Sequence, residues 1–94
     1  MSYKMMIIDD DEITLDLVQA LMEDDYTIIK MKSGVQALAQ LKEDPDVDVI
    51  LLDMMMPDLD GMKVLSAIKE DKRLSLIPVI LLTSLEGINF EAEG

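Results

Sequence analysis

The stretch Val47-Asp-Val-Ile-Leu-Leu-Asp53 is the most informative segment of this sequence. It is an almost continuous run of β-branched and aliphatic residues that stops at a carboxylate. Such a run is typical of a strand that is covered on both faces, as in parallel sheets whose helices pack on either side. The sequence therefore predicts a buried parallel strand over residues 47–52, with Asp53 at its carboxyl end.

Further apolar runs lie on both sides of this segment, and helical patterns separate them. They predict strands over residues 3–8, 26–31 and 78–82. Apolar residues at helical spacing predict helices over residues 13–22, between Ser33-Gly34 and Asp44-Pro45-Asp46, from Gly61 to the charged run 69–73, and from residue 85 to about residue 90. Strands that alternate with helices in this way indicate right-handed βαβ units, so the predicted fold class is α/β, an open parallel sheet with helices on both faces.

Composition restricts the classes of function. The 94 residues include 20 acidic and 8 basic side chains, a net charge of -12, and 50% of them are hydrophobic, which indicates one small acidic globular domain. The absence of Cys and His excludes disulfides, thiolate zinc sites and Ser-His-Asp or Cys-His catalysis within this chain. The longest apolar runs reach about six residues, far short of the ~20 that cross a bilayer, so we expect a cytoplasmic protein without membrane contact. The negative charge also disfavours direct contact with nucleic acid.

Polar side chains follow three of the predicted strands at the point where each strand ends. Asp9 and Asp10 follow the first strand, Asp53 follows the third and Thr83 follows the fourth. Sites in open α/β sheets form outside the carboxyl ends of the strands, so these residues would converge if the first and third strands are neighbours. Clustered carboxylates repel one another, and the repulsion is relieved either by a proton, which raises one pKa, or by a hard divalent cation.

Magnesium suits such a cluster, and a metal-loaded carboxylate can receive a phosphoryl group, with Asp53 as the nucleophile. The simpler alternative is that Asp10, Asp11 or Glu12 caps the following helix. That alternative explains one residue at a time but not the joint placement at three strand ends.

Three motifs resemble the receiver domain of two-component response regulators. They are Met5-Met-Ile-Ile-Asp-Asp-Asp-Glu12, Leu51-Leu-Asp-Met-Met-Met-Pro-Asp-Leu-Asp-Gly61 and Ile77-Pro-Val-Ile-Leu-Leu-Thr-Ser84. The second motif is specific, because an Asp after an apolar strand is followed four residues later by Pro and eight residues later by Gly. The resemblance covers essentially the whole chain and implies a flavodoxin-like sheet with the strand order 2-1-3-4.

The resemblance also implies a function for the strand-end residues. Asp53 would accept a phosphoryl group from a sensor histidine kinase or a phosphotransfer protein. Asp9, Asp10, Asp53 and the backbone carbonyl of Met55 would hold Mg²⁺. Thr83 would be the switch hydroxyl that moves to the phosphoryl oxygens and changes a protein-interaction surface. Such a domain is not an enzyme toward other substrates, because it catalyses only its own phosphoryl transfer and hydrolysis.

The sequence departs from the family pattern at its carboxyl end. Residues 1–94 correspond to a receiver domain truncated before strand five, so the fifth strand, the last helix and the site lysine of the family are absent. The apolar strand over residues 78–82 would then be an edge, which is unfavourable unless something covers it. We therefore expect a longer parent chain, and a homodimer through the side of the fourth strand and fourth helix is one arrangement that would cover the edge.

Two other functions compete with the phosphoacceptor. A magnesium-dependent phosphohydrolase of the haloacid dehalogenase type also uses a strand-end Asp, but that class needs a second Asp two residues later, where this chain has Met55. A receiver-like interaction module that is not phosphorylated would fit the missing lysine. The acidic residues and Thr83 at the strand ends argue against it.

Overall fold

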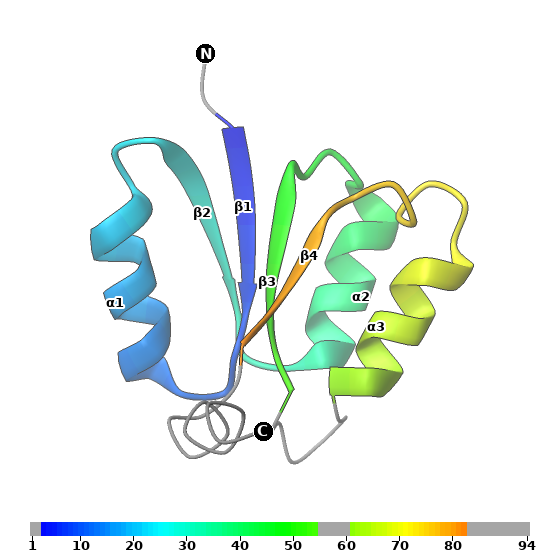
Figure 1. The fold of residues 1–94 in the computed structure, drawn as a ribbon, viewed down its shortest axis with the longest axis horizontal. Coiled ribbons are helices and arrows are strands. Elements are labelled where there is room, and N and C mark those ends of the chain that lie inside the picture. Colours follow the sequence, from blue (N-terminus) through cyan, green and yellow to red (C-terminus); the bar gives the residue numbers. More distant parts are fainter. Residues whose placement is uncertain (1–2, 55–60, 83–94) are drawn as a thin grey trace, which may run out of the picture.

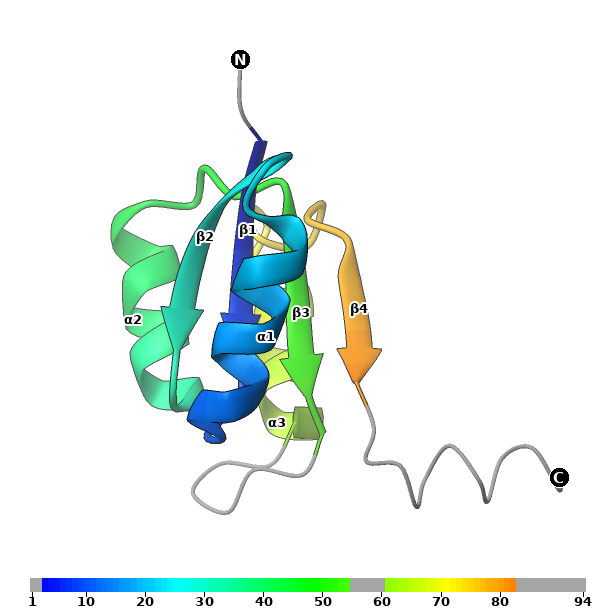
Figure 2. The ribbon, with the colours of Figure 1, turned by 90° about the vertical axis from the view of Figure 1, so that its left-hand side faces the viewer.

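The computed structural model describes residues 3–54 and 61–82, which form a four-stranded sheet with helices on both faces (Figures 1 and 2). All strand pairs are parallel, and the strand order is β2-β1-β3-β4. This confirms the predicted α/β class and the order 2-1-3-4. In chain order the elements are β1 (Tyr3–Ile8), α1 (Glu12–Met22), β2 (Tyr26–Met31), α2 (Gly34–Glu43), β3 (Val49–Asp53), α3 (Gly61–Glu70) and β4 (Val79–Leu82).

The elements match the predicted ranges except at their ends. Val47 and Asp48 precede β3. The amide of Val47 donates locally to the carbonyl of Pro45 at 2.8 Å, whereas the amide of Asp48 already donates to the carbonyl of Lys4 in β1 at 2.9 Å. Pro78 precedes β4, since it has no N–H to donate to a ladder, although its carbonyl accepts from the amide of Ile50 at 3.0 Å. The helix predicted from residue 85 lies outside the described residues.

The two central strands, β1 and β3, bury side chains on both faces of the sheet. On one face Met6, Ile8, Ile50 and Leu52 pack against the buried residues of α2 and α3. On the other face Met5, Ile7 and Leu51 pack against Leu15 of α1. Met5 to Ile8 are at most 3% exposed. Burial on both faces explains why these strands read as unbroken apolar runs rather than as an alternating pattern.

The register brings the ends of β1 and β3 to the same level. Ile8 pairs with Leu52 in the parallel ladder, so the next residues along the two strands are Asp9 and Asp53. The ladder between β1 and β2 extends one step further, because the amide of Asp9 donates to the carbonyl of Met31 at 3.0 Å. The backbone alone thus places two carboxylates side by side at the carboxyl edge of the sheet.

β4 is an edge strand of the described sheet, paired only with β3. Two of its apolar side chains are exposed, Ile80 by 51% and Leu81 by 44%. In Figure 2 α1 lies over β1 and β3, and no helix drawn in colour covers β4 on that face. None of the helices in the described ranges is long and apolar enough to cross a membrane.

Candidate functional site

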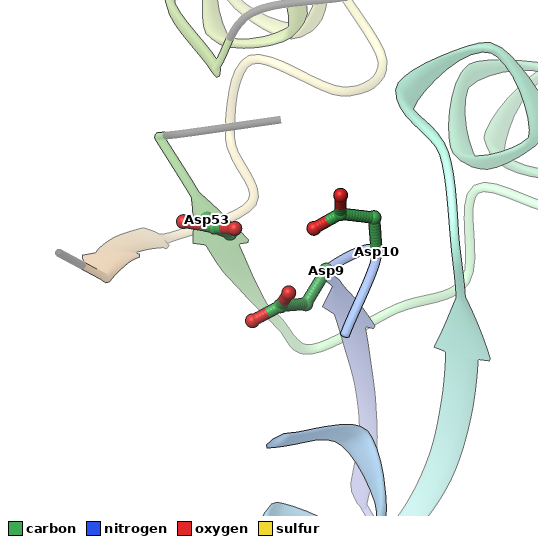
Figure 3. Close-up of side chains that lie close together, drawn as sticks. All are labelled: Asp9, Asp10 and Asp53. Atoms are coloured by element: carbon green, nitrogen blue, oxygen red, sulfur yellow. The ribbon is translucent and has the colours of Figure 1, made fainter. Parts of the chain in front are cut away.

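Three carboxylates converge at the carboxyl ends of β1 and β3. Each of Asp9, Asp10 and Asp53 offers an oxygen within 4.8 Å of the others (Figure 3). Asp9 is buried, with 6% of its surface exposed, whereas Asp53 is half-buried and Asp10 is exposed. The structure therefore brings together three of the residues that the sequence analysis assigned to one site.

Local hydrogen bonds show which aspartate caps α1. The carboxylate of Asp11 accepts from the amide of Ile13 at 3.1 Å and from the hydroxyl of Thr14 at 3.0 Å, so Asp11 is the N-cap. The carboxylate of Asp9 accepts from the amide of Asp11 at 2.9 Å, which fixes the turn after β1. Since Asp11 caps the helix, capping does not account for Asp9 and Asp10.

Burial raises the pKa of Asp9 from its ordinary value of 3.8 to about 6. The hydrogen bond from the Asp11 amide lowers this pKa, while the negative charges of Asp53 and Asp10 raise it further. In the absence of a cation and below about pH 6, part of the repulsion within the cluster is therefore relieved by a proton on Asp9. A cation bound to the three carboxylates would release that proton.

The raised pKa gives a pH dependence of stability. Between pH 3.8 and about 6 the folded protein holds a proton on Asp9 that the unfolded chain has already lost. This contribution therefore stabilises the fold at low pH and is lost as the pH rises through about 6. We expect Asp9→Asn, which stays neutral, to raise the urea midpoint of the metal-free protein more at about pH 7.5 than at about pH 5. An equal effect at both pH values would contradict a raised pKa.

Magnesium provides a second readout of the same group. A Mg²⁺ ion held by this cluster would bind the ionised carboxylate, so its affinity for the wild-type protein should fall as the pH is lowered through about 6. A calorimetric titration at the two pH values measures this change, with Asp25→Asn as an exposed control that should behave like the wild type.

Two predicted site residues, Met55 and Thr83, lie outside the described residues. The nearest described positions are Met54 and Leu82. Leu82 pairs with Asp53 in the ladder between β3 and β4, and the amide of Met54 donates to the carbonyl of Leu82 at 3.2 Å. The end of β4 is thus adjacent to the end of β3.

Gly61 has a role at the site that the sequence analysis did not assign. A Cβ at this position would lie 2.6 Å from Cα of Met54 and 2.9 Å from the carbonyl oxygen of Asp53. The first residue of α3 therefore packs directly against the backbone that carries Asp53. Its place eight residues after Asp53, in the second of the three motifs, was the available signal.

A hollow elsewhere in the described part of the chain carries none of this chemistry. It measures about 320 Å³ and is lined by Tyr3, Tyr26, Asp48 and Val49, at the amino ends of the strands. The three converging carboxylates lie at the carboxyl ends of the strands, on the opposite edge of the sheet. The candidate site is therefore identified by its clustered carboxylates and not by a hollow in the surface.

Comparison with known proteins identifies the family. The sequence matches the model of the response regulator receiver domain over residues 5–93. The chain belongs to the response regulator receiver domain family. This confirms the resemblance that the motifs indicated.

The curated relatives of this receiver domain include PleD and DivK. The response regulator PleD of Caulobacter vibrioides is 37% identical over 95 residues, which cover 100% of this chain and 21% of PleD. The polar-differentiation response regulator DivK of Brucella ovis is 35% identical over 85 residues, which cover 89% of this chain and 68% of DivK. The chain thus spans about a fifth of PleD and about two thirds of DivK.

Solved structures share the fold. The N-terminal domain of a response regulator receiver protein from Methanoculleus marisnigri is 33% identical with a TM-score of 0.80, and the match covers 96% of this chain and 76% of that chain. The phosphorylated cyanobacterial phytochrome response regulator RcpA is 28% identical with a TM-score of 0.83, and the match covers 99% of this chain and 74% of that chain.

Receiver domains typically act as phosphoacceptors and interact with histidine kinases or phosphotransfer proteins. They generally bind Mg²⁺ at an acidic pocket, and the described residues fit that metal. Mg²⁺ prefers hard oxygen ligands and is bound in proteins through one or a few carboxylates together with water. The cluster of Asp9, Asp10 and Asp53 offers such ligands within 4.8 Å of one another.

Proposed function

We propose that Asp53 of this receiver domain accepts a phosphoryl group from a sensor histidine kinase or a phosphotransfer protein in a Mg²⁺-dependent reaction. The observation that carries the proposal is the convergence of the Asp9, Asp10 and Asp53 carboxylates at the ends of β1 and β3 in a chain of this family. Phosphorylation would then change the surface through which the domain contacts other proteins. The domain would catalyse only its own phosphoryl transfer and hydrolysis.

Differences in burial support the proposed roles of the carboxylates. Asp53 is half-buried, so a phosphoryl donor can approach it, whereas Asp9 is almost fully buried. An oxygen of Asp53 forms the new bond to phosphorus as the bond between phosphorus and the donor breaks. Asp9 and Asp10, with Asp53 and the backbone carbonyl of Met55, would hold the metal. When bound there, Mg²⁺ would offset negative charge on the phosphoryl oxygens.

The remaining parts of the proposal follow the family pattern. Thr83, the residue after β4, would provide the hydroxyl that hydrogen-bonds the phosphoryl oxygens and couples them to the interaction surface. Residues 1–94 would all belong to the receiver domain. We propose a cytoplasmic location. We also propose no direct contact of these residues with nucleic acid, because a net charge of -12 repels phosphate backbones. A homodimer would use the exposed edge at β4.

Phosphoryl uptake from a small donor tests the proposal without knowledge of the kinase. The intact mass of the purified protein is measured before and after incubation with acetyl phosphate and Mg²⁺. We expect the mass to increase by a single phosphoryl group, and only in the presence of the metal. No increase in a folded protein would favour an interaction module that is not phosphorylated.

The exposed face of α1 is a surface for the protein donor. Ile13, Leu17 and Leu21 recur at every fourth position of the helix and are 77%, 57% and 69% exposed. Residues four apart lie on one side of a helix, so the three side chains form a single apolar stripe. The stripe begins beside the turn that carries Asp9 and Asp10. We infer that the protein donor docks on it while its phosphoryl group reaches Asp53.

Leu17→Glu should slow phosphoryl transfer from the cognate kinase by about tenfold or more, since a charge then enters an apolar interface. Labelling by acetyl phosphate should be unchanged, because this donor needs no docking surface. Val35→Glu is the matched control, because Val35 is 63% exposed but lies on α2, across the sheet. Equal slowing by both substitutions, or slowing with both donors, would argue against docking on α1.

A further inference from the structure

We propose that Lys32 holds the turn that carries Asp9 and Asp10 and is therefore a positioning residue for the metal ligands, an inference that rests on the proposed function. Lys32 directly follows β2, and its Nζ forms an ion pair with the carboxylate of Glu12. Glu12 is the first residue of α1 and lies three positions after Asp9 in the sequence.

The other end of the same turn is attached to the residue before Lys32. The amide of Asp9 donates to the carbonyl of Met31 at 3.0 Å. Met31 and Lys32 thus hold the two ends of the segment 9–12, one through the backbone and the other through a side chain. Between these ends the Asp11 amide donates to the Asp9 carboxylate at 2.9 Å. The orientation of the Asp9 carboxylate is therefore linked to the position of the turn.

The turn needs such support because it carries like charges. Asp9, Asp10 and Asp53 repel one another, and Asp11 and Glu12 add two further acidic residues to the same segment. Within the segment 9–12, Glu12 is the acidic residue for which the described part of the chain shows an ion pair with a lysine. Lys32 and Glu12 are 55% and 69% exposed, so the pair is screened by solvent. We therefore expect a small effect on metal binding, with a definite sign.

The direction of the change in Mg²⁺ affinity distinguishes a positioning role from an effect of charge alone. Removing a cation near an acidic site strengthens Mg²⁺ binding if only the charge matters. Removing a residue that positions the ligands weakens Mg²⁺ binding. Lys32→Met is thus expected to weaken the affinity for Mg²⁺ by about two- to fivefold, the range of an exposed ion pair. The two explanations predict opposite changes for one substitution.

Lys30→Met is a matched control. Lys30 lies two residues earlier, within β2, and pairs at 3.2 Å with Asp16, one helical turn beyond Glu12 on α1. The substitution removes the same charge and an equivalent link between β2 and α1, but it leaves the segment 9–12 untouched. Lys32→Arg keeps the positive charge and can still pair with Glu12, so its affinity for Mg²⁺ should match that of the wild type.

The experiment combines calorimetric Mg²⁺ titration with amide hydrogen exchange of the metal-free protein, for the wild type and the three variants. We expect Lys32→Met to weaken Mg²⁺ binding and to speed exchange at the amides of Asp11 and Ile13. Exchange at the Gln36 amide, which donates to Ser33 at the start of α2, should stay unchanged as an internal reference. Lys30→Met should leave Mg²⁺ binding unchanged or slightly stronger.

Unchanged or stronger Mg²⁺ binding in Lys32→Met, or unchanged exchange at Asp11 and Ile13, would overturn the positioning role. A wild-type protein that is folded but binds no Mg²⁺ would instead overturn the proposed function. In that case the exchange rates of the metal-free variants still decide whether Lys32 holds the turn.

Discussion

Asp53→Asn is expected to reduce phosphoryl uptake from acetyl phosphate by at least about a thousandfold, because the amide keeps the shape of the side chain and removes the nucleophilic oxygen. Asp53 is the half-buried member of the three converging carboxylates. The substitution leaves Asp9 and Asp10 in place. The intact mass after incubation with acetyl phosphate and Mg²⁺ measures the result. The mass of the variant should stay that of the unmodified protein.

The same substitution has a predicted side effect that shows whether the variant is folded. The charge of Asp53 is one of the causes that raise the pKa of Asp9. Neutralising it relieves repulsion in the cluster, so Asp53→Asn should unfold at an equal or higher urea concentration than the wild type. Asp25→Asn, at an exposed acid between α1 and β2, controls for the loss of one charge. Wild-type uptake by Asp53→Asn would show that a different residue accepts the phosphoryl group.

Gly61→Ala is expected to destabilise the domain by about 1–3 kcal/mol, the usual cost of forcing extra volume into a packed region. The added Cβ would lie 2.6 Å from Cα of Met54 and 2.9 Å from the carbonyl oxygen of Asp53. Both are backbone atoms, so the clash cannot be relieved by a side-chain rotation. Either α3 or the end of β3 must move. If the end of β3 moves, Asp53 moves with it.

Whether Gly61→Ala lowers or raises the stability shows whether the space beside Gly61 is filled. In a helix with open space around the glycine, replacement by alanine would stabilise the fold by about 0.5–1 kcal/mol, because alanine has the higher helix propensity. Urea unfolding therefore distinguishes the two cases by sign. Ser66→Ala, at an exposed position on α3, should change the midpoint little. A stabilised Gly61→Ala variant would show that α3 does not press on the strand that carries Asp53.

Local sequence patterns were sufficient for the elements and for the candidate residues. β1 and β3 are buried on both faces, so their composition is almost purely apolar and they can be recognised without partners. The carboxylates stand at the points where these runs stop, so the runs themselves indicate Asp9, Asp10 and Asp53. Between the strands, apolar residues recur every three or four positions, and this helical spacing located the helices.

Other features depend on residues far apart in the sequence. The strand order came from the resemblance of three motifs, since periodicity does not state which strands are neighbours. Once β1 lies beside β3, the pairing of Ile8 with Leu52 brings Asp9 and Asp53 to one level. The unequal burial of Asp9 and Asp10, adjacent in sequence and of the same type, arises only from this packing and raises the pKa of Asp9.

The sequence by itself therefore determined the α/β class, the order of elements along the chain and the acidic chemistry of the site, because these depend on local composition. Only the tertiary structure decided that Gly61 must lack a side chain, that Lys32 pairs with Glu12 and that Asp11 rather than Asp10 caps α1. The first two are contacts between segments that are separate in sequence, and the third depends on the direction in which the chain leaves β1. The spacing of Gly61 after Asp53 marks its position in the motif, but the close approach of its backbone to Met54 and the pairing of Lys32 with Glu12 exist only once the chain has folded.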